Sequence, residues 1–232
     1  MAVKRRPRRT APGWEGVEVF ALGHSTRSAE ELIELLRAHG VRTLADVRTV
    51  PRSRTNPQFN VDQLPETLAG EGIAHAHLPR LGGLRKPRPD SPNQGWRNAS
   101  FRGYADYMMT EDFERGLEQL RSLASKGPLA IMCAEALRWR CHRSLVADAL
   151  WTRGVVVRHI ESRTRATPHV PTPFARFRGT RVWYPAALTE DPSNRRAGRR
   201  RQSRVSDTSP AATTGRCRGR RTARRSRSPE SP

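Results

Sequence analysis

The sequence has little cysteine, few acidic residues and no long apolar run, and each shortage excludes a class of protein. Only three of the 232 residues are cysteine, an odd and small number that does not fit the disulfide framework of a small secreted domain. No stretch approaches about eighteen consecutive apolar residues, so no membrane-spanning helix is predicted. No apolar segment follows the basic N-terminus, as a secretory signal would require. We therefore expect a cytoplasmic protein with free thiols and no membrane partner.

Acidic residues number 22 against 43 lysines and arginines, and the net charge of +21 is concentrated at the two ends. Residues 1–10 hold five basic residues and no acidic one, and residues 191–232 hold thirteen arginines and three acidic residues. Both ends lack apolar periodicity, so we expect residues 1–15 and 191–232 to be disordered. Tails of this kind would bind nucleic acid without sequence specificity, through phosphate contacts that weaken as salt rises.

Between the tails, short apolar runs alternate with segments of helical spacing. The runs predict strands at 17–22, 41–47, 73–78, 129–133 and 155–160. Helices are predicted at 28–39, 61–69, 104–109, 111–125 and 141–153, the first of them beginning with a capping box formed by Ser28 and Glu31. This alternation predicts an α/β domain over residues 16–162, with about five mostly parallel strands and helices on both faces. Residues 163–190 would form a C-terminal extension, and the proline-rich segment 79–98 a loop covering a negatively charged ligand.

Polar residues follow every predicted strand. Ligands of parallel sheets bind beyond the carboxyl ends of the strands, so we expect these side chains to share one site. In that site His24 would act as an acid–base group and Asp46 as a general base or charge partner, while Ser25 and Arg48 would bind an anion. The remaining strand-end residues are His77, Cys133, Glu135, His159 and Glu161.

The segment from Met132 to Arg143 contains two thiols, a carboxylate, a histidine and three arginines. Cys133 is expected where a strand passes into a loop ahead of a helix, and backbone amides and arginines there would lower its thiol pKa. We interpret Cys133 as a nucleophile or redox thiol and Glu135 as a second catalytic group. The expected ligand is an anionic small molecule, phosphorylated or nucleotide-like, bound by Arg140, His142 and Arg143. The loop from Cys133 to Arg138 resembles the cysteine loops of rhodanese-like sulfurtransferases and cysteine-dependent phosphatases, whose amides surround an oxyanion.

Other interpretations of the same residues stay open. Cys133, Glu135, Cys141 and His142 all offer ligand atoms suited to zinc or another divalent metal, although their spacing fits no standard zinc motif. Cys133 could also be a small buried hydrophobic residue, and Ser25 a helix cap. Glu135 could pair with Arg140 or Arg143. The sequence requires no cofactor.

Seven motifs in a fixed order together resemble the bacterial and archaeal family catalogued as domain of unknown function 488. They are Gly23–Ser28, Asp46–Arg48, Pro51–Ser53, Asn56–Asn60, Leu81–Gly83, Phe101–Tyr104, and Met132–Glu135 with Arg140–Arg143. The resemblance extends from about Val17 to Ile160. It implies an enzyme-like or ligand-binding domain whose polar motifs lie at the expected edge of the sheet, and it implies no particular activity.

Overall fold

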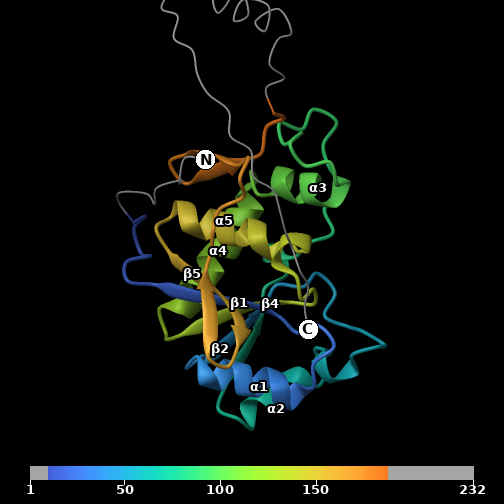
Figure 1. The fold of residues 1–232 in the computed structure, drawn as a ribbon, viewed down its shortest axis with the longest axis vertical. Helices are drawn as coiled ribbons and strands as arrows, with labels where there is room; N and C mark the ends of the chain where they lie inside the picture. Colours follow the sequence, from blue (N-terminus) through green and yellow to red (C-terminus); the bar gives the residue numbers. More distant parts are fainter. Residues whose placement is uncertain (1–9, 188–232) are drawn as a thin grey trace, which may run out of the picture. The chain divides into compact units, whose positions relative to one another are not determined.

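The computed structural model describes residues 10–187, which form an α/β domain (Figure 1). Residues 1–9 and 188–232, including the predicted C-terminal tail, lie outside the described residues. The predicted N-terminal tail reached residue 15, but Trp14 is buried and the N–H of Ala11 donates to the carbonyl of Arg153 at 2.9 Å. Residues 10–15 therefore lie against the domain. No helix within residues 10–187 is long and apolar enough to cross a membrane.

A six-stranded sheet forms the centre of the domain, in the order β3-β2-β4-β1-β5-β6. The strands are β1 (Glu18–Gly23), β2 (Thr43–Asp46), β3 (Ala74–His77), β4 (Leu129–Cys133), β5 (Val156–Ser162) and β6 (Arg165–Pro168). The first five are parallel, which confirms the predicted fold class, and β6 pairs antiparallel with β5. The sixth strand lies in the segment expected as an extension, because a short polar edge strand has no apolar alternation to reveal it.

Helices cover both faces of the sheet (Figure 1). On one face, α1 (Ala29–Ala38) and α2 (Leu64–Ala69) enclose an apolar cluster with Leu22 and Met132. On the other face, α3 (Ala99–Tyr107), α4 (Glu111–Ala124) and α5 (Arg143–Thr152) enclose a second cluster with Ala21 and Cys133. Neighbouring residues of a strand thus point to different cores, as the two-residue period of a strand requires. This alternation decides which site residues can meet.

The helix ends follow local capping chemistry. The predicted capping box is confirmed, since the Ser28 hydroxyl accepts from the N–H of Glu31 and the Glu31 carboxylate accepts from the N–H of Ser28. Helix α3 begins five residues before the predicted start, because the Asn98 side chain accepts from the N–H groups of Ser100 and Phe101.

The segment 79–98 is held in place by one buried carboxylate. Asp106 on α3 accepts hydrogen bonds from the backbone N–H of Arg88, the hydroxyl of Ser91 and the amide of Asn93.

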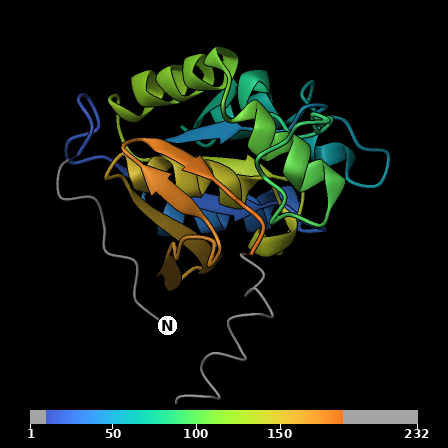
Figure 2. The same ribbon diagram turned by 90° about the horizontal axis from the view of Figure 1, so that it is seen from above.

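Three short 3₁₀ helices, η1 (Pro57–Phe59), η2 (Pro79–Leu81) and η3 (Arg138–Arg140), shape the loops at the strand ends. A hairpin of β7 (Arg176–Arg178) and β8 (Arg181–Trp183), orange in Figure 2, packs on α5, where the rings of Phe177 and Trp151 are 5.1 Å apart.

Candidate functional site

The predicted site residues do lie at the carboxyl ends of the parallel strands, but the sheet separates them into two clusters. Asp46 pairs with Met132 in the parallel register, so it points toward α1 and α2, whereas Cys133 points toward α5. We call the first group the arginine cluster; it consists of His24, Asp46, Arg48 and His75. We call the second group the thiol cluster; it consists of Cys133, Cys141, His142 and Arg143.

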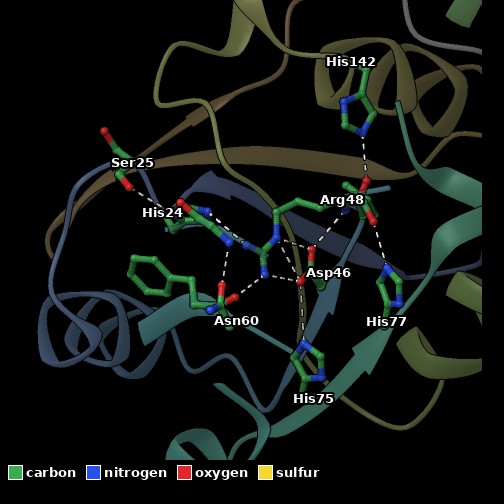
Figure 3. Close-up of polar contacts among 11 residues, drawn as sticks. His24, Ser25, Asp46, Arg48, Asn60, His75, His77 and His142 are labelled. Carbon is green, nitrogen blue, oxygen red and sulfur yellow. Dashed lines mark hydrogen bonds and ion pairs between the residues drawn. The ribbon is translucent and has the colours of Figure 1, made fainter. Parts of the chain in front are cut away.

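The arginine cluster is built around a buried ion pair (Figure 3). The guanidinium of Arg48 donates to both oxygens of Asp46, with Nε 2.9 and 3.0 Å away and Nη2 2.5 Å away. Nη2 also donates to the carbonyl of Phe59 at 2.6 Å, and Nη1 lies 3.3 Å from Nε2 of His24. The ring of His24 packs on that of Phe59, 4.2 Å between centroids, and its Nδ1–H donates to the carbonyl of Ser25. Arg48 is therefore engaged on all sides by the protein itself.

The charges of the arginine cluster agree with this geometry. Burial acts to raise the pKa of Asp46, but donors and the positive charge of Arg48 outweigh it and hold that pKa at about 2. Nε2 of His75 lies 3.9 Å from the carboxylate, which is too long for a hydrogen bond, so we assign the low pKa mainly to Arg48. Burial, together with the charge of Arg48, lowers the pKa of His24, although the bond to Ser25 opposes it. A neutral His24 then accepts from Arg48. The cluster therefore resembles a structural network of buried hydrogen bonds more than an open anion site.

The thiol cluster has the geometry of a cysteine–histidine pair. Nδ1 of His142 lies 3.8 Å from Sγ of Cys133 and 3.9 Å from Sγ of Cys141. The opposite ring nitrogen, Nε2, donates to the carbonyl of Val47 at 2.9 Å, as Figure 3 shows. Because Nε2 donates to Val47, Nδ1 is the nitrogen that faces the two sulfurs and can exchange a proton with them. Both thiols are free and buried.

Arg143 is fully buried beside the two thiols and has no carboxylate partner among the described residues. Its Nη1 donates to the carbonyl of Glu135 at 3.1 Å and lies 3.9 Å from Sγ of Cys141. Its Nη2 donates to the carbonyl of Ala136 at 3.4 Å, while Nε has no hydrogen-bond partner among residues 10–187. A buried, uncompensated cation is costly, so this position favours an anion nearby.

The two thiols have opposite pKa shifts. A hydrogen bond from Cys141 is the largest effect that lowers the pKa of Cys133 well below its usual value; His142 and the charge of Arg143 add to it, and burial opposes it. The same contact, together with burial, raises the pKa of Cys141. Cys133 is therefore the more readily ionised of the two thiols, and Cys141 keeps its proton to higher pH.

Two residues hold the histidine ring in place. The ring of Tyr104 lies 4.9 Å from that of His142, and its hydroxyl donates to the carbonyl of Leu81. Gly83 also lies close to the ring, because a methyl group added there would stand 3.0 Å from Nδ1 of His142. The Leu81–Gly83 motif thus leaves just enough room for the ring to face the sulfurs.

Several predicted site residues lie apart from both clusters. The carboxylate of Glu135 accepts from the N–H of Leu137, and Glu135 is not in the metal-capable group of the described residues, which is Cys133, Cys141 and His142. Arg140 is exposed in η3. Ser25 adopts a left-handed conformation, with φ of 54°, two residues after the end of β1.

One backbone amide of the loop from Cys133 to Arg138 has a partner within the loop. The N–H of Leu137 donates to the carboxylate of Glu135 at 3.2 Å, so this amide is already engaged. The N–H groups of Arg140 and Cys141, which follow the loop, donate to the carbonyls of Leu137 and Arg138.

Two buried residues, Asp148 and His169, were not among the predicted site residues; they form a hydrogen-bonded line with His159, which was predicted at the end of the fifth strand. The available signals were a lone aspartate inside the apolar segment 145–151 and a histidine at the end of the fifth strand. The contact itself joins α5, β5 and the segment after β6, which no local pattern predicts.

The sequence model of the family described as "Domain of unknown function DUF488" matches residues 28–150. The chain belongs to this family. No curated protein and no solved structure matches the chain. The DUF488 match includes Asp46, Arg48 and the whole thiol cluster, whereas His24, His159 and His169 lie outside it.

Proposed function

We propose that this DUF488 protein is an enzyme whose Cys133 thiolate attacks an anionic, phosphorylated substrate. The observation that carries this proposal is the Cys133–His142 pair. A nucleophile, a base at 3.8 Å and a carbonyl that orients the base form the arrangement that activates cysteine in covalent catalysis. The pKa of Cys133, lowered well below its usual value, favours the thiolate form that such an attack needs.

Arg143 supplies the anion site in this proposal. Its buried guanidinium has an unused N–H at Nε and no carboxylate partner among residues 10–187, and a substrate oxyanion would accept a charge-assisted hydrogen bond there. The thiol cluster lies close to the surface of the domain. His142 is only half-buried, and Ala134, Ala136 and Leu137 in the loop after β4 are exposed.

The chemistry then follows from the protonation states. The sulfur of Cys133 forms a bond to phosphorus as the bond from phosphorus to the leaving oxygen breaks. The proton that His142 holds at Nδ1 in the ion pair passes to that oxygen. Water, deprotonated by the same nitrogen, cleaves the thiophosphate bond and restores the thiolate.

The test is turnover of a panel of phosphomonoesters, with sulfur donors for comparison, by wild type, Cys133→Ser and Cys141→Ser. We expect turnover by wild type, loss in Cys133→Ser and a smaller reduction in Cys141→Ser. Intact mass spectrometry of quenched reactions should show phosphate bound to wild type and not to Cys133→Ser. Equal background turnover by all three proteins would overturn the proposal.

A metal site is the second candidate. Zinc bound tetrahedrally by thiolate and imidazole places sulfur and nitrogen about 3.6 Å apart, given bond lengths of about 2.3 and 2.05 Å. The observed separations of 3.8 and 3.9 Å are close to that, and a ligand histidine commonly donates its other N–H to a carbonyl, as His142 does to Val47. Three ligands would leave a position for water or substrate. Elemental analysis decides, because metal at one equivalent that is lost in His142→Gln would favour this candidate.

The basic ends support an additional proposal, which is non-specific nucleic-acid binding. Thirteen arginines between residues 191 and 232 would neutralise phosphates in a salt-dependent way, and the charge pattern is the only support for this role.

A further inference from the structure

A buried line of three residues ends in a ring nitrogen on the same face of the sheet as the thiol cluster. Asp148 on α5 accepts from Nε2 of His169 at 2.9 Å, and Nδ1 of His169 lies 3.0 Å from Nε2 of His159. His159 is 4% exposed, and its Nδ1 has no hydrogen-bond partner among the described residues. A buried polar atom without a partner is costly, so this one calls for an explanation.

The direction of the hydrogen bonds is fixed by the carboxylate. Asp148 also accepts from the N–H and hydroxyl of Thr172 and from the hydroxyl of Tyr184. Among so many donors Asp148 is the acceptor, and Nε2 of His169 carries a proton. Nδ1 of His169 therefore accepts from Nε2–H of His159. The remaining nitrogen of His159, Nδ1, is left with a lone pair and acts as a pure acceptor.

Burial, His169 and the charges of Arg138 and Arg143 lower the pKa of His159 to about 3. The ring is therefore neutral at physiological pH, and its Nδ1 needs a donor from elsewhere.

Arg143 offers the complementary feature on the same face of the sheet. His159 pairs with Ala21, which pairs with Ile131, and the cluster that includes Ala21 and Ile131 packs against α5. Arg143 is the first residue of α5, and its Nε–H is a second buried polar group without a partner among residues 10–187. Its positive charge acts on both Cys133 and His159. One unused donor and one unused acceptor thus lie on the face of the sheet that holds the proposed nucleophile.

We propose that Arg143 and His159 together bind a singly protonated oxyanion, with the ionised oxygen accepting from Nε–H of Arg143 and the O–H group donating to Nδ1 of His159. This inference rests on the proposed function, from which it takes Arg143 as the anion ligand. It narrows the substrate to phosphate monoesters in their monoanionic form, whose second pKa is about 6. Sulfate esters are excluded, because they have no proton to donate. Asp148 and His169 are positioning residues that fix the tautomer of His159.

The experiment compares inorganic phosphate with sulfate, which match in size and geometry but differ in the proton. Binding to the full chain is measured by calorimetry at pH 7, where phosphate retains a proton and sulfate does not. Two variants distinguish the roles of the two ring nitrogens of His159. His159→Gln keeps a donor toward His169 and loses the acceptor at the Nδ1 position, whereas His159→Asn keeps an acceptor near that position and loses the link to His169.

We expect phosphate to bind wild type and His159→Asn, and to bind His159→Gln about 10- to 100-fold more weakly, as expected when a hydrogen bond to a charged group is removed. Sulfate should bind wild type about as weakly as phosphate binds His159→Gln. If phosphate and sulfate bind equally to wild type and His159→Gln, this inference fails while the anion site at Arg143 stands. If wild type binds neither anion, both this inference and the anion site of the proposed function fail.

A second measurement uses only the wild-type protein, so it does not depend on whether a variant folds. In wild type, the ring nitrogen signals of His159 should show Nδ1 unprotonated, and phosphate but not sulfate should shift that signal. A protonated Nδ1 in the free protein, or an equal response to both anions, would overturn the proposal.

Discussion

Nε2 of His142 donates to the carbonyl oxygen of Val47 at 2.9 Å, across 95 positions of the chain. This contact joins the end of β2 to the residue before α5, and it turns Nδ1 of the ring toward the sulfurs of Cys133 and Cys141. The arginine cluster and the thiol cluster are thus linked through adjacent residues, since Arg48 follows Val47. The hydrogen bonds that hold Arg48 also fix the neighbouring carbonyl of Val47, which orients the ring of His142.

The first prediction concerns the reactivity of Cys133. His142→Gln keeps a donor for Val47 but removes Nδ1, so the pKa of Cys133 should rise toward its usual value. The thiolate fraction at pH 7 falls about tenfold for each unit by which that pKa exceeds 7, and alkylation of Cys133 by iodoacetamide at pH 7 should slow by about tenfold. Peptide mass spectrometry measures the rate at each cysteine.

The matched control is His39→Gln. Nε2 of His39 also donates to a backbone carbonyl, that of Ser162 at 2.8 Å, but this ring is distant from the thiols in the fold. Alkylation of Cys133 should be unchanged in this variant. Slowing of similar size in both variants would show that His142 has no direct effect on the sulfur.

The second prediction concerns Gly83. Alanine at this position would place a methyl group 3.0 Å from Nδ1 of His142 and displace the ring from the sulfurs. We expect slower alkylation of Cys133, about threefold to tenfold on the reasoning used for His142→Gln, with little loss of stability. Gly70→Ala is the control, because its methyl group would meet nothing closer than 3.7 Å. Unchanged alkylation of Cys133 in Gly83→Ala would show that the space at Gly83 does not control the position of the His142 ring.

The sequence predicts the strands well because their apolar runs are buried on both faces, and the strand Leu129–Cys133 is predicted to the residue. It also predicts that polar residues gather at one edge. It does not predict the separation into two clusters, because that depends on the pairing of Asp46 with Met132, and inter-strand register leaves no local signal.

Some sequence features have a reason only in three dimensions. Gly23 ends β1, and a methyl group there would stand 1.9 Å from the carbonyl oxygen of Glu135. The line from Asp148 to His159 likewise joins segments that are distant in the chain. Local patterns describe elements, and these contacts arise between elements.

The third prediction concerns the basic C-terminal segment. Deleting residues 188–232 removes thirteen arginines and should weaken binding of duplex DNA at low salt. The slope of log affinity against log salt should become shallower by about 0.9 for each DNA phosphate that the segment neutralises in the full chain. Fluorescence anisotropy at several salt concentrations measures both quantities. Identical affinity and slope in the full and shortened chains would assign no nucleic-acid binding to this segment.

The fourth prediction concerns the stability of the arginine cluster. Asp46→Asn leaves the buried guanidinium of Arg48 without its charge partner, so the free energy of unfolding at pH 7 should fall by about 3–5 kcal/mol. Asp62→Asn is the control, because Asp62 pairs with Arg52 on the surface and its loss should cost about 0–1 kcal/mol. Urea denaturation measures both changes. Equal, small losses would show that the buried pair contributes nothing beyond a surface pair.

The same carboxylate predicts the acid sensitivity of the fold. The pKa of Asp46 is about 2 in the folded protein and 3.8 as its ordinary value, so the unfolded chain binds the proton more tightly. A depressed folded pKa stabilises the protein above the unfolded pKa, and that contribution, about 2 kcal/mol, is lost as pH falls from about 4 to about 2. The stability difference between wild type and Asp46→Asn should therefore be constant from pH 7 to about 5 and shrink below about 4. A difference that stays constant down to pH 2 would mean that Asp46 is not the group that titrates.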